Sequence, residues 1–244
     1  MRKKGMPWYL KWFNEDYEKF YAHRDPEEAE KQVDFIIRSL KVKKNARVLD
    51  LGCGMGRHCF AFANRGYEVV GIDLSSYLIG KAREQLKQNP ALSIQFELGP
   101  IEEIKAIGPF DLVINIFTSF GYYTCDADNA NVFCAVRQYL SKGGKFFFDY
   151  LHPSEVKRGL IPYEERQIAD ETVEIHKNIE GDRIIKTMIF PGRTYREKVK
   201  LYCRKTIEEM LSHHRLRVIQ VWNDYEGHPW KKNGDRQLFY CQAE

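Results

Sequence analysis

The sequence predicts an α/β fold, a seven-stranded, mostly parallel sheet with helices on both faces and a small antiparallel β-sheet inserted near its end. Two observations predict it. Over residues 46–150, short apolar runs alternate with helix-length segments, the pattern of parallel strands connected by helices. Over residues 162–203, apolar and polar side chains alternate in three successive runs, which is typical of antiparallel strands.

Composition narrows the class of protein. The chain has 244 residues, enough to bury a sizeable core, and a net charge of only +4. Basic and acidic residues are interleaved, so nucleic-acid binding is not expected. No apolar stretch is long enough for a signal peptide or a membrane span. The six cysteines lack CxxC spacing, which argues against a bound metal and suits reduced thiols, so we expect a cytoplasmic protein without membrane association.

The N-terminal region predicts two helices before the first strand. Aromatic residues recur at helical spacing over residues 8–22, which predicts one helix. Asp25 as N-cap and Pro26 in the first turn predict a second helix, over 26–40. These helices either pack on the sheet or cover a ligand site. The side chains that would then reach a bound cofactor are Tyr17, Tyr21 and Arg24.

Residues 47–58, RVLDLGCGMGRH, predict a strand that runs through three glycines into a helix. Such a turn brings bare backbone close to a ligand at a helix N-terminus. A dinucleotide fingerprint requires glycine at position 57, which is Arg57 here. Asp50, two residues before Gly52, would repel a pyrophosphate but suits a ligand with an ammonium group.

The second predicted strand, residues 67–73, ends in Asp73, which lies 21 residues after Gly52. An acid at this point accepts both ribose hydroxyls of an adenosine moiety in the dinucleotide-binding fold. Asp73 would otherwise cap the next helix, residues 75–89, although Ser75 can supply that cap. We therefore expect Asp73 to bind ribose.

The motif Asp-x-Gly-x-Gly-x-Gly resembles motif I of the class I S-adenosylmethionine-dependent methyltransferases. FTSFGYY at 117–123, after the fourth predicted strand (110–116), and DYEKFYAHRD at 16–25 resemble a bacterial small-molecule group of these enzymes. The resemblance implies a Rossmann-like fold and S-adenosyl-L-methionine as cofactor. It also implies that the end of the fourth strand lies beside the methionine part and the reacting methyl.

The resemblance implies a set of cofactor-binding residues, which are Asp50, Gly52, Cys53, Gly54, Gly56, Asp73, Leu74, Ile101, Ile116 and Phe117. Cys53 fits equally well as a small filler of the loop. The chain departs from the family at Pro100, where an acid commonly binds the adenine amino group. Adenine would instead be held by the backbone N–H of Ile101 and the apolar walls of Leu74 and Ile101, with Glu102 or Glu103 as a replacement acid.

The remaining predicted elements complete the sheet. They are a third strand at 93–98, a helix at 126–140, a fifth strand at 141–150, a helix at 204–214, and strands at 216–225 and 235–241. The two closing strands match the methyltransferase pattern, in which the last strand lies antiparallel beside the fifth. Residues 1–161 and 204–244 then form the cofactor-binding domain, and 162–203 form a roof over the substrate pocket, a homodimer contact, or both.

A sulfonium methyl donor is reactive, so the protein mainly has to align a nucleophile for in-line displacement and exclude water. For a protonated oxygen or nitrogen nucleophile, a general base is a further option, and the sequence leaves open whether one is used. The candidates by position are Tyr122, Tyr123, Tyr150 and His152. His152 fits equally well as a loop histidine bonded to the backbone before Pro153.

The sequence therefore predicts transfer of a methyl group to N or O of a small-molecule acceptor. Two alternatives stay open. An RNA methyltransferase would need a basic face or an appended RNA-binding module. A non-catalytic S-adenosylmethionine-binding protein would fit the departure at Pro100.

Overall fold

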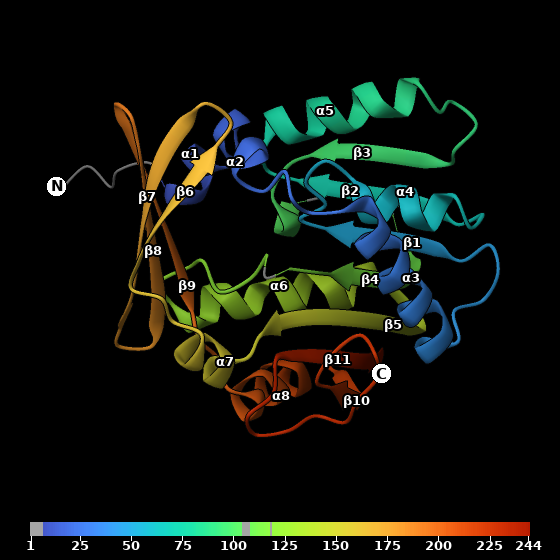
Figure 1. Ribbon diagram of the computed structural model, residues 1–244. Coiled ribbons are helices and arrows are strands. Elements are labelled where there is room, and N and C mark those ends of the chain that lie inside the picture. Colours follow the sequence, from blue (N-terminus) through green and yellow to red (C-terminus); the bar gives the residue numbers. More distant parts are fainter. Residues whose placement is uncertain (1–6, 104–107, 118) are drawn as a thin grey trace, which may run out of the picture.

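The computed structural model describes residues 7–103, 108–117 and 119–244 of the chain. Residues 1–6, 104–107 and 118 of the predicted cofactor-binding domain therefore lie outside the described residues, and 118 belongs to the motif at 117–123. Its larger sheet has the strand order β10-β11-β5-β4-β1-β2-β3 (Figure 1), which confirms the predicted seven-stranded, mostly parallel sheet. The strands are β1 (Arg47–Leu51), β2 (Glu68–Asp73), β3 (Ile94–Leu98), β4 (Phe110–Asn115), β5 (Leu140–Leu151), β10 (Leu216–Trp222) and β11 (Arg236–Ala243). As predicted, β11 lies antiparallel beside β5.

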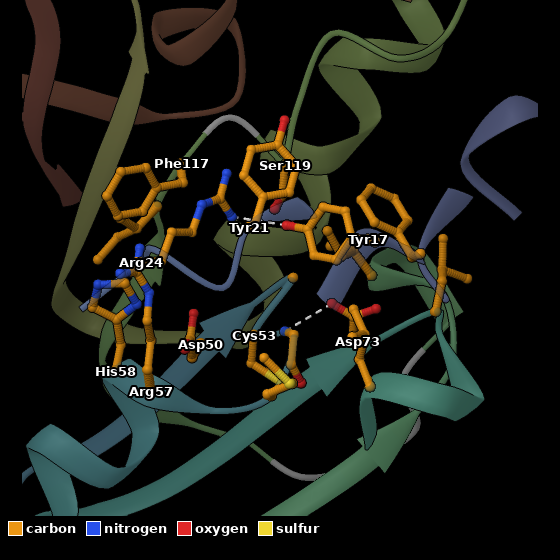
Figure 2. A pocket seen from close by; sticks show the side chains of 18 of the residues that line it. Tyr17, Tyr21, Arg24, Asp50, Cys53, Arg57, His58, Asp73, Phe117 and Ser119 are labelled. Atoms are coloured by element: carbon orange, nitrogen blue, oxygen red, sulfur yellow. Dashed lines mark hydrogen bonds between the residues drawn. The ribbon is translucent and has the colours of Figure 1, made fainter. Parts of the chain in front are cut away.

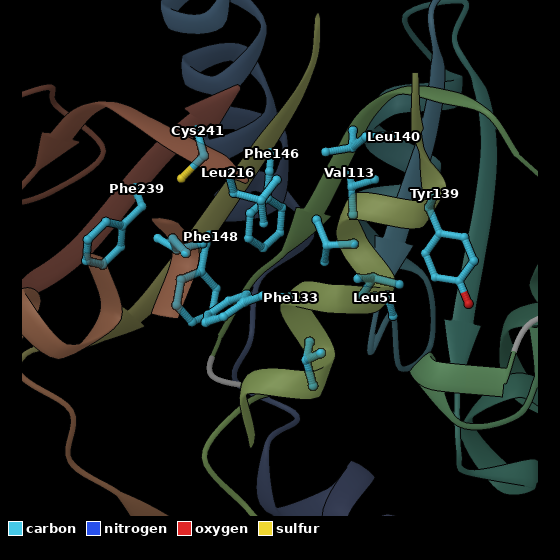
Figure 3. Close-up of a cluster of buried hydrophobic side chains, with 14 of the residues drawn as sticks. Leu51, Val113, Phe133, Tyr139, Leu140, Phe146, Phe148, Leu216, Phe239 and Cys241 are labelled. Atoms are coloured by element: carbon cyan, nitrogen blue, oxygen red, sulfur yellow. The ribbon is translucent and has the colours of Figure 1, made fainter. Parts of the chain in front are cut away.

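Helices cover both faces of this sheet. They are α3 (Pro26–Leu40), α4 (Arg57–Ala63), α5 (Ser76–Lys87), α6 (Asp126–Tyr139) and α8 (Arg204–His213), with a short 3-10 turn, η1 (Ile101–Glu103). Successive residues of a strand point to opposite faces of the sheet and pack into two separate hydrophobic cores, one on each face. Leu49 and Phe148 pack with α6 and α8 (Figure 3), while Val48 and Phe147 pack with α3 and α4. No helix in the described part of the chain is both long and apolar enough to cross a bilayer.

The predicted helix over 8–22 is wrong in its continuity. The structure divides it into α1 (Trp8–Trp12) and α2 (Glu15–Phe20). Asn14 is the cause, because its side chain accepts hydrogen bonds from the backbone N–H groups of Asp16 and Tyr17, at 2.9 and 3.3 Å. An asparagine in this role starts a new helix rather than continuing the old one.

The inserted sheet is four-stranded and antiparallel, in the order β6-β7-β8-β9. Its strands are β6 (Tyr163–Ile168), β7 (Glu171–Glu180), β8 (Arg183–Phe190) and β9 (Arg193–Lys200). Three alternating runs were predicted, and β6 was not, because three of its six residues are charged and it has few apolar side chains. The buried face of the sheet packs Val173 and Met188 against Trp12 and Phe20 of the N-terminal helices. A homodimer contact through this sheet stays a prediction.

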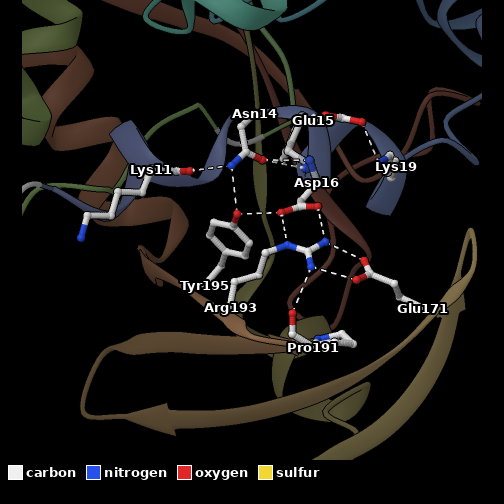
Figure 4. A network of polar contacts seen from close by, with 10 residues as sticks. Lys11, Asn14, Glu15, Asp16, Lys19, Glu171, Pro191, Arg193 and Tyr195 are labelled. Atoms are coloured by element: carbon white, nitrogen blue, oxygen red, sulfur yellow. Dashed lines mark hydrogen bonds and ion pairs between the residues drawn. The ribbon is translucent and has the colours of Figure 1, made fainter.

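A polar network also fastens α2 to the inserted sheet (Figure 4). The Arg193 guanidinium donates to both carboxylate oxygens of Asp16 at 2.6 Å, and to Glu171 at 2.9 and 2.6 Å. Tyr195 adds a hydrogen bond to Asp16 at 2.7 Å. Hydrogen bonding by Arg193 holds the pKa of Asp16 below its usual range. Helices α1 and α2 and the inserted sheet thus form one packed unit. From here on, the roof means this whole unit and not the inserted sheet alone.

Candidate functional site

The carboxyl ends of β1, β2 and β4 meet at one edge of the sheet, because the three strands are parallel neighbours. A cavity of about 570 Å³ opens there, between this edge and the roof. We call it the first cavity, and Figure 2 shows the side chains that line it. Ligands of open α/β sheets bind at this edge.

The glycine loop leaves β1 through Gly52, whose φ is +73°. The N–H groups of Gly52 and Cys53 both donate to the carbonyl oxygen of Ile72, at 2.8 and 2.9 Å. A Cβ atom on Gly52 would lie 2.4 Å from the Ser119 Oγ, so only glycine fits. Gly56, which precedes α4, lies outside the cavity lining and makes room for the ring of Phe96 instead.

Asp73 stands at the centre of the edge. Its Oδ2 accepts the N–H of Gly54 and its Oδ1 accepts the N–H of Ser75, both at 2.8 Å. Ser75 supplies the cap of α5, since its Oγ accepts the N–H of Leu78 at 3.1 Å. Burial raises the pKa of Asp73, and the backbone hydrogen bonds oppose that shift. Each oxygen keeps a lone pair for a further donor.

Asp50 and Cys53 also line the first cavity. Asp50 is 2% exposed and accepts a hydrogen bond from the Cys59 thiol at 3.3 Å. Burial raises the pKa of its carboxyl to about 7. Burial also raises the pKa of the Cys53 thiol to about 11, so this thiol stays protonated. Cys53 is therefore suited to filling space and not to nucleophilic attack.

At one end of the first cavity, two apolar side chains and one acid lie together in the lining. Leu74 and Ile101 line it, as does the side chain of Glu102. The Tyr123 hydroxyl donates to Glu102 Oε1 at 3.1 Å, which orients the carboxylate. Pro100 is not part of the lining. Of the two replacement acids considered for the adenine amino group, Glu102 is the one that reaches the cavity.

The other end is built around Phe117, at the end of β4 with Ile116. The guanidinium carbons of Arg24 and Arg57 lie 5.4 and 4.4 Å from the centre of its ring. Arg24 also donates to the Tyr17 hydroxyl at 2.8 Å. Arg24 was predicted to reach the cofactor, whereas Arg57 served only to exclude a dinucleotide. His58 and Ser119 also line the cavity. They belong to RVLDLGCGMGRH and FTSFGYY but were not predicted as site residues, because neither motif shows where these side chains point.

The four candidate bases are divided by the structure. Tyr122 and Tyr123 line the first cavity. Tyr150 is fully buried, and its hydroxyl donates to the backbone carbonyl of Lys200. His152 caps α7 (Pro153–Arg158), accepting the N–H of Ser154 at Nδ1, while Nε2 lies 3.0 Å from a backbone carbonyl oxygen. Tyr150 and His152 lie outside the first cavity, so neither is kept as a candidate base.

A second cavity of about 330 Å³ adjoins the first. It lies under the roof, and β8 and β9 contribute Ile184, Lys186, Glu197 and Val199 to its lining. The residues shared by both cavities are Phe13, Tyr17, Tyr21, Arg24, Phe117 and Tyr122. The two cavities therefore adjoin along a shared boundary of aromatic side chains and a guanidinium.

Within the described residues, one group of carboxylates and imidazole has the spacing to hold a metal. It comprises Asp224, Glu226 and His228, on the connection between β10 and β11. None of the three lines either cavity. The predicted absence of a bound metal stays a prediction.

Comparisons with known proteins agree with this geometry. A family model described as a methyltransferase domain matches residues 42–215. The Bacillus subtilis protein YqeM, provisionally named a methyltransferase, is 26% identical over 212 residues, which cover 82% of this chain and 85% of YqeM.

Two solved structures share the fold. An S-adenosylmethionine-dependent methyltransferase from Clostridium acetobutylicum has a TM-score of 0.80 at 19% identity, covering 93% of this chain and 96% of its own. CalS10 from Micromonospora echinaspora, an amino pentose methyltransferase with S-adenosylmethionine bound, has a TM-score of 0.70 at 21% identity, covering 94% of this chain and 97% of its own.

The geometry of Asp73 leads to a first prediction. If Asp73 accepts both ribose hydroxyls, Asp73→Ala should weaken S-adenosylmethionine binding by roughly a hundredfold or more, because two hydrogen bonds to a carboxylate are lost. Calorimetric titration measures the change, and Asp111→Ala, an exposed acid of β4, is the control. An unchanged affinity in a folded Asp73→Ala protein would rule out ribose binding.

The buried Asp50 leads to a second prediction. A carboxyl whose pKa rises from 3.8 to about 7 on folding retains its proton more firmly in the folded state. The folded state has its full stability below about pH 4, where this carboxyl is protonated. As the pH rises to about 7, the free energy of unfolding falls by roughly 4 kcal/mol, because the folded state holds the proton more firmly than the unfolded state. Asp50→Asn should therefore raise the free energy of unfolding at pH 8 by a few kcal/mol at most, and hardly change it at pH 4.

Urea unfolding at several pH values measures this difference. Glu103→Gln, at an exposed acid, should show no such trend. A difference between Asp50→Asn and wild type that does not vary with pH would contradict the assigned cause.

Proposed function

This chain belongs to the methyltransferase domain family and is an S-adenosylmethionine-dependent methyltransferase, and we propose that it transfers the methyl group to N or O of a small molecule. The observation that carries the proposal is the pair of adjoining cavities. The first takes the methyl donor and the second takes the acceptor. Phe117 and Tyr122 line both, so a donor and an acceptor would meet at this wall.

The proposed donor pose follows the polar groups of the first cavity. Asp73 accepts the ribose hydroxyls, and the adenine lies between Leu74 and Ile101 with Glu102 at its edge. The methionine part then extends towards Phe117 and Arg24. These assignments satisfy the general requirement that a buried polar ligand group meets a complementary partner.

In the proposed reaction, a lone pair on the acceptor forms a bond to the methyl carbon while the carbon–sulfur bond breaks. The sulfonium becomes a neutral thioether, and the acceptor later loses a proton. Burial raises the pKa of the Tyr122 phenol well above its usual range, so Tyr122 would orient the acceptor as a hydrogen-bond donor rather than remove its proton. This favours an amine acceptor, whose proton can leave after methylation.

A small acceptor fits the second cavity better than RNA does. The cavity holds about 330 Å³, within the range of small-molecule sites. Two of its cations are already paired, Lys186 with Glu197 at 2.7 Å and Lys177 with Glu164 at 2.7 Å. An RNA backbone would instead require a row of cations free to meet phosphates.

Incubation with methyl-labelled S-adenosylmethionine tests the proposal. The acceptors offered are a panel of small amines and alcohols, and unmodified RNA in parallel. We expect label in a small molecule and none in RNA. Label in RNA alone, or donor binding without transfer to any acceptor in the panel, would overturn the proposal.

Filling the second cavity gives a sharper prediction. Ile184→Trp should lower methyl transfer at least tenfold by blocking the acceptor, while donor affinity stays within about twofold of wild type. Thr187→Trp is the matched control, because successive β8 residues point to opposite faces and Thr187 lines neither cavity. Equal losses of donor binding and transfer would show that the second cavity is not a separate acceptor site.

A further inference from the structure

His58 lies at the Phe117 end of the first cavity and has no role in the functions described above. It occupies the first turn of α4 and is 5% exposed. Its ring lies 5.9 Å from that of Phe117, centre to centre. In Figure 2, His58 and Arg57 gather beside Arg24, at the end of the cavity away from Asp73.

A chain of hydrogen bonds determines which nitrogen of His58 carries the proton. The carboxylate of Glu28 accepts from Gln32 Nε2 at 3.0 Å, so the Gln32 amide oxygen must point the other way. That oxygen lies 2.8 Å from His58 Nε2. A carbonyl oxygen cannot donate, so Nε2 carries the hydrogen and Nδ1 presents a lone pair.

This tautomer is reinforced from both sides. Arg57 pairs with Glu28 at 3.2 Å, which holds that carboxylate in place as the acceptor for Gln32. Burial, with help from the charges of Arg57 and Arg24, holds the pKa of His58 well below its usual range. The imidazole therefore stays neutral near pH 7, and Nδ1 remains an acceptor.

Two polar groups here lack a protein partner. Over residues 7–103, 108–117 and 119–244, no donor reaches His58 Nδ1, although the side chain is almost completely buried against the cavity. Arg57 Nη2 is a buried donor without an acceptor in the same part of the chain. An acceptor and a donor on consecutive residues complement a ligand that carries both an ammonium and a carboxylate.

We propose that His58 Nδ1 accepts a hydrogen bond from the α-ammonium of the cofactor's methionine moiety, while Arg57 Nη2 donates to its α-carboxylate. The proposal rests on the donor pose given under the proposed function. Asp73 holds the ribose, so the amino-acid end of the same molecule must reach away from it, towards these two groups. Gln32 then acts as a positioning residue that keeps Nδ1 free of hydrogen.

The test compares two ligands that differ in one group. They are S-adenosylhomocysteine and its desamino analogue, which keeps the carboxylate and lacks the α-amino group. His58→Phe removes the acceptor and keeps a flat ring. We expect His58→Phe to weaken S-adenosylhomocysteine about tenfold or more, as for a hydrogen bond to a charged group, and to leave the desamino analogue within about twofold.

His58→Asn is the matched control, because its amide oxygen can stand near the position of Nδ1. It should recover part of the preference for the amino-bearing ligand. If His58→Phe does not fold, Gln32→Met provides the test instead. It keeps the imidazole but removes the hydrogen bond that holds the hydrogen on Nε2. Gln32→Met should weaken S-adenosylhomocysteine several-fold more than the desamino analogue.

Three results would overturn the proposal. The first is equal weakening of both ligands, which would mean that His58 only supports the loop. The second is unchanged affinity for both ligands in His58→Phe with kcat also unchanged. The third is unchanged affinity for both ligands with a lower kcat, which would make His58 a proton acceptor. Failure of the donor pose itself is distinguishable, because Asp73→Ala would then leave the affinity for S-adenosylhomocysteine unchanged.

Discussion

The carboxylate of Asp73 is the contact on which the ligand edge depends. By accepting the N–H groups of Gly54 and Ser75, each at 2.8 Å, it joins the glycine loop to the start of α5. Backbone donors of this kind favour the ionised form of a carboxylate and oppose the effect of its burial. One side chain thus shapes the loop and places two acceptor oxygens at the edge of the cavity.

The same edge of the sheet carries ionisable side chains whose burial costs folding free energy. Asp50 is 2% exposed, and among the described residues its one hydrogen-bond donor is the Cys59 thiol. His58 is held neutral by its surroundings. Perturbed groups of this kind gather at functional sites, because a ligand supplies the missing partners. The two apolar cores, with Phe148 on one face of the sheet and Phe147 on the other, offset that cost elsewhere.

The roof divides the chemistry between two parts of the chain. The carboxyl ends of β1 and β2 contribute two acids to the first cavity, Asp50 and Asp73. The second cavity draws on the roof, where β8 and β9 lie against the N-terminal helices. Arg193 binds α2 to β7 through Asp16 and Glu171, although these segments are far apart in sequence. Under the proposed function, donor binding and acceptor choice could change almost independently.

Local patterns carried the fold and part of the site. Strand runs, helix caps and the spacing from Gly52 to Asp73 involve neighbouring residues, so they can be read from the sequence. The antiparallel placement of the last strand beside the fifth and the identity of the methyl donor followed from a resemblance instead. The break at Asn14 was missed because the aromatic spacing continues across it, whereas the capping bonds do not show in that spacing.

Positions at strand ends did not reveal where side chains point. Tyr150 shares the parity of Phe146 and Phe148 and therefore enters an apolar core. His152 became a helix cap, and its partner carbonyl belongs to Lys231, 79 residues away.

Residues close together in the chain are enough to predict the sheet, the glycine turn and, through the resemblance, the class of methyl donor. The position of Gln32 beside His58 and the second cavity under the roof become visible only in the folded chain. Those features join side chains from distant elements, and such pairs form only when packing brings the elements together.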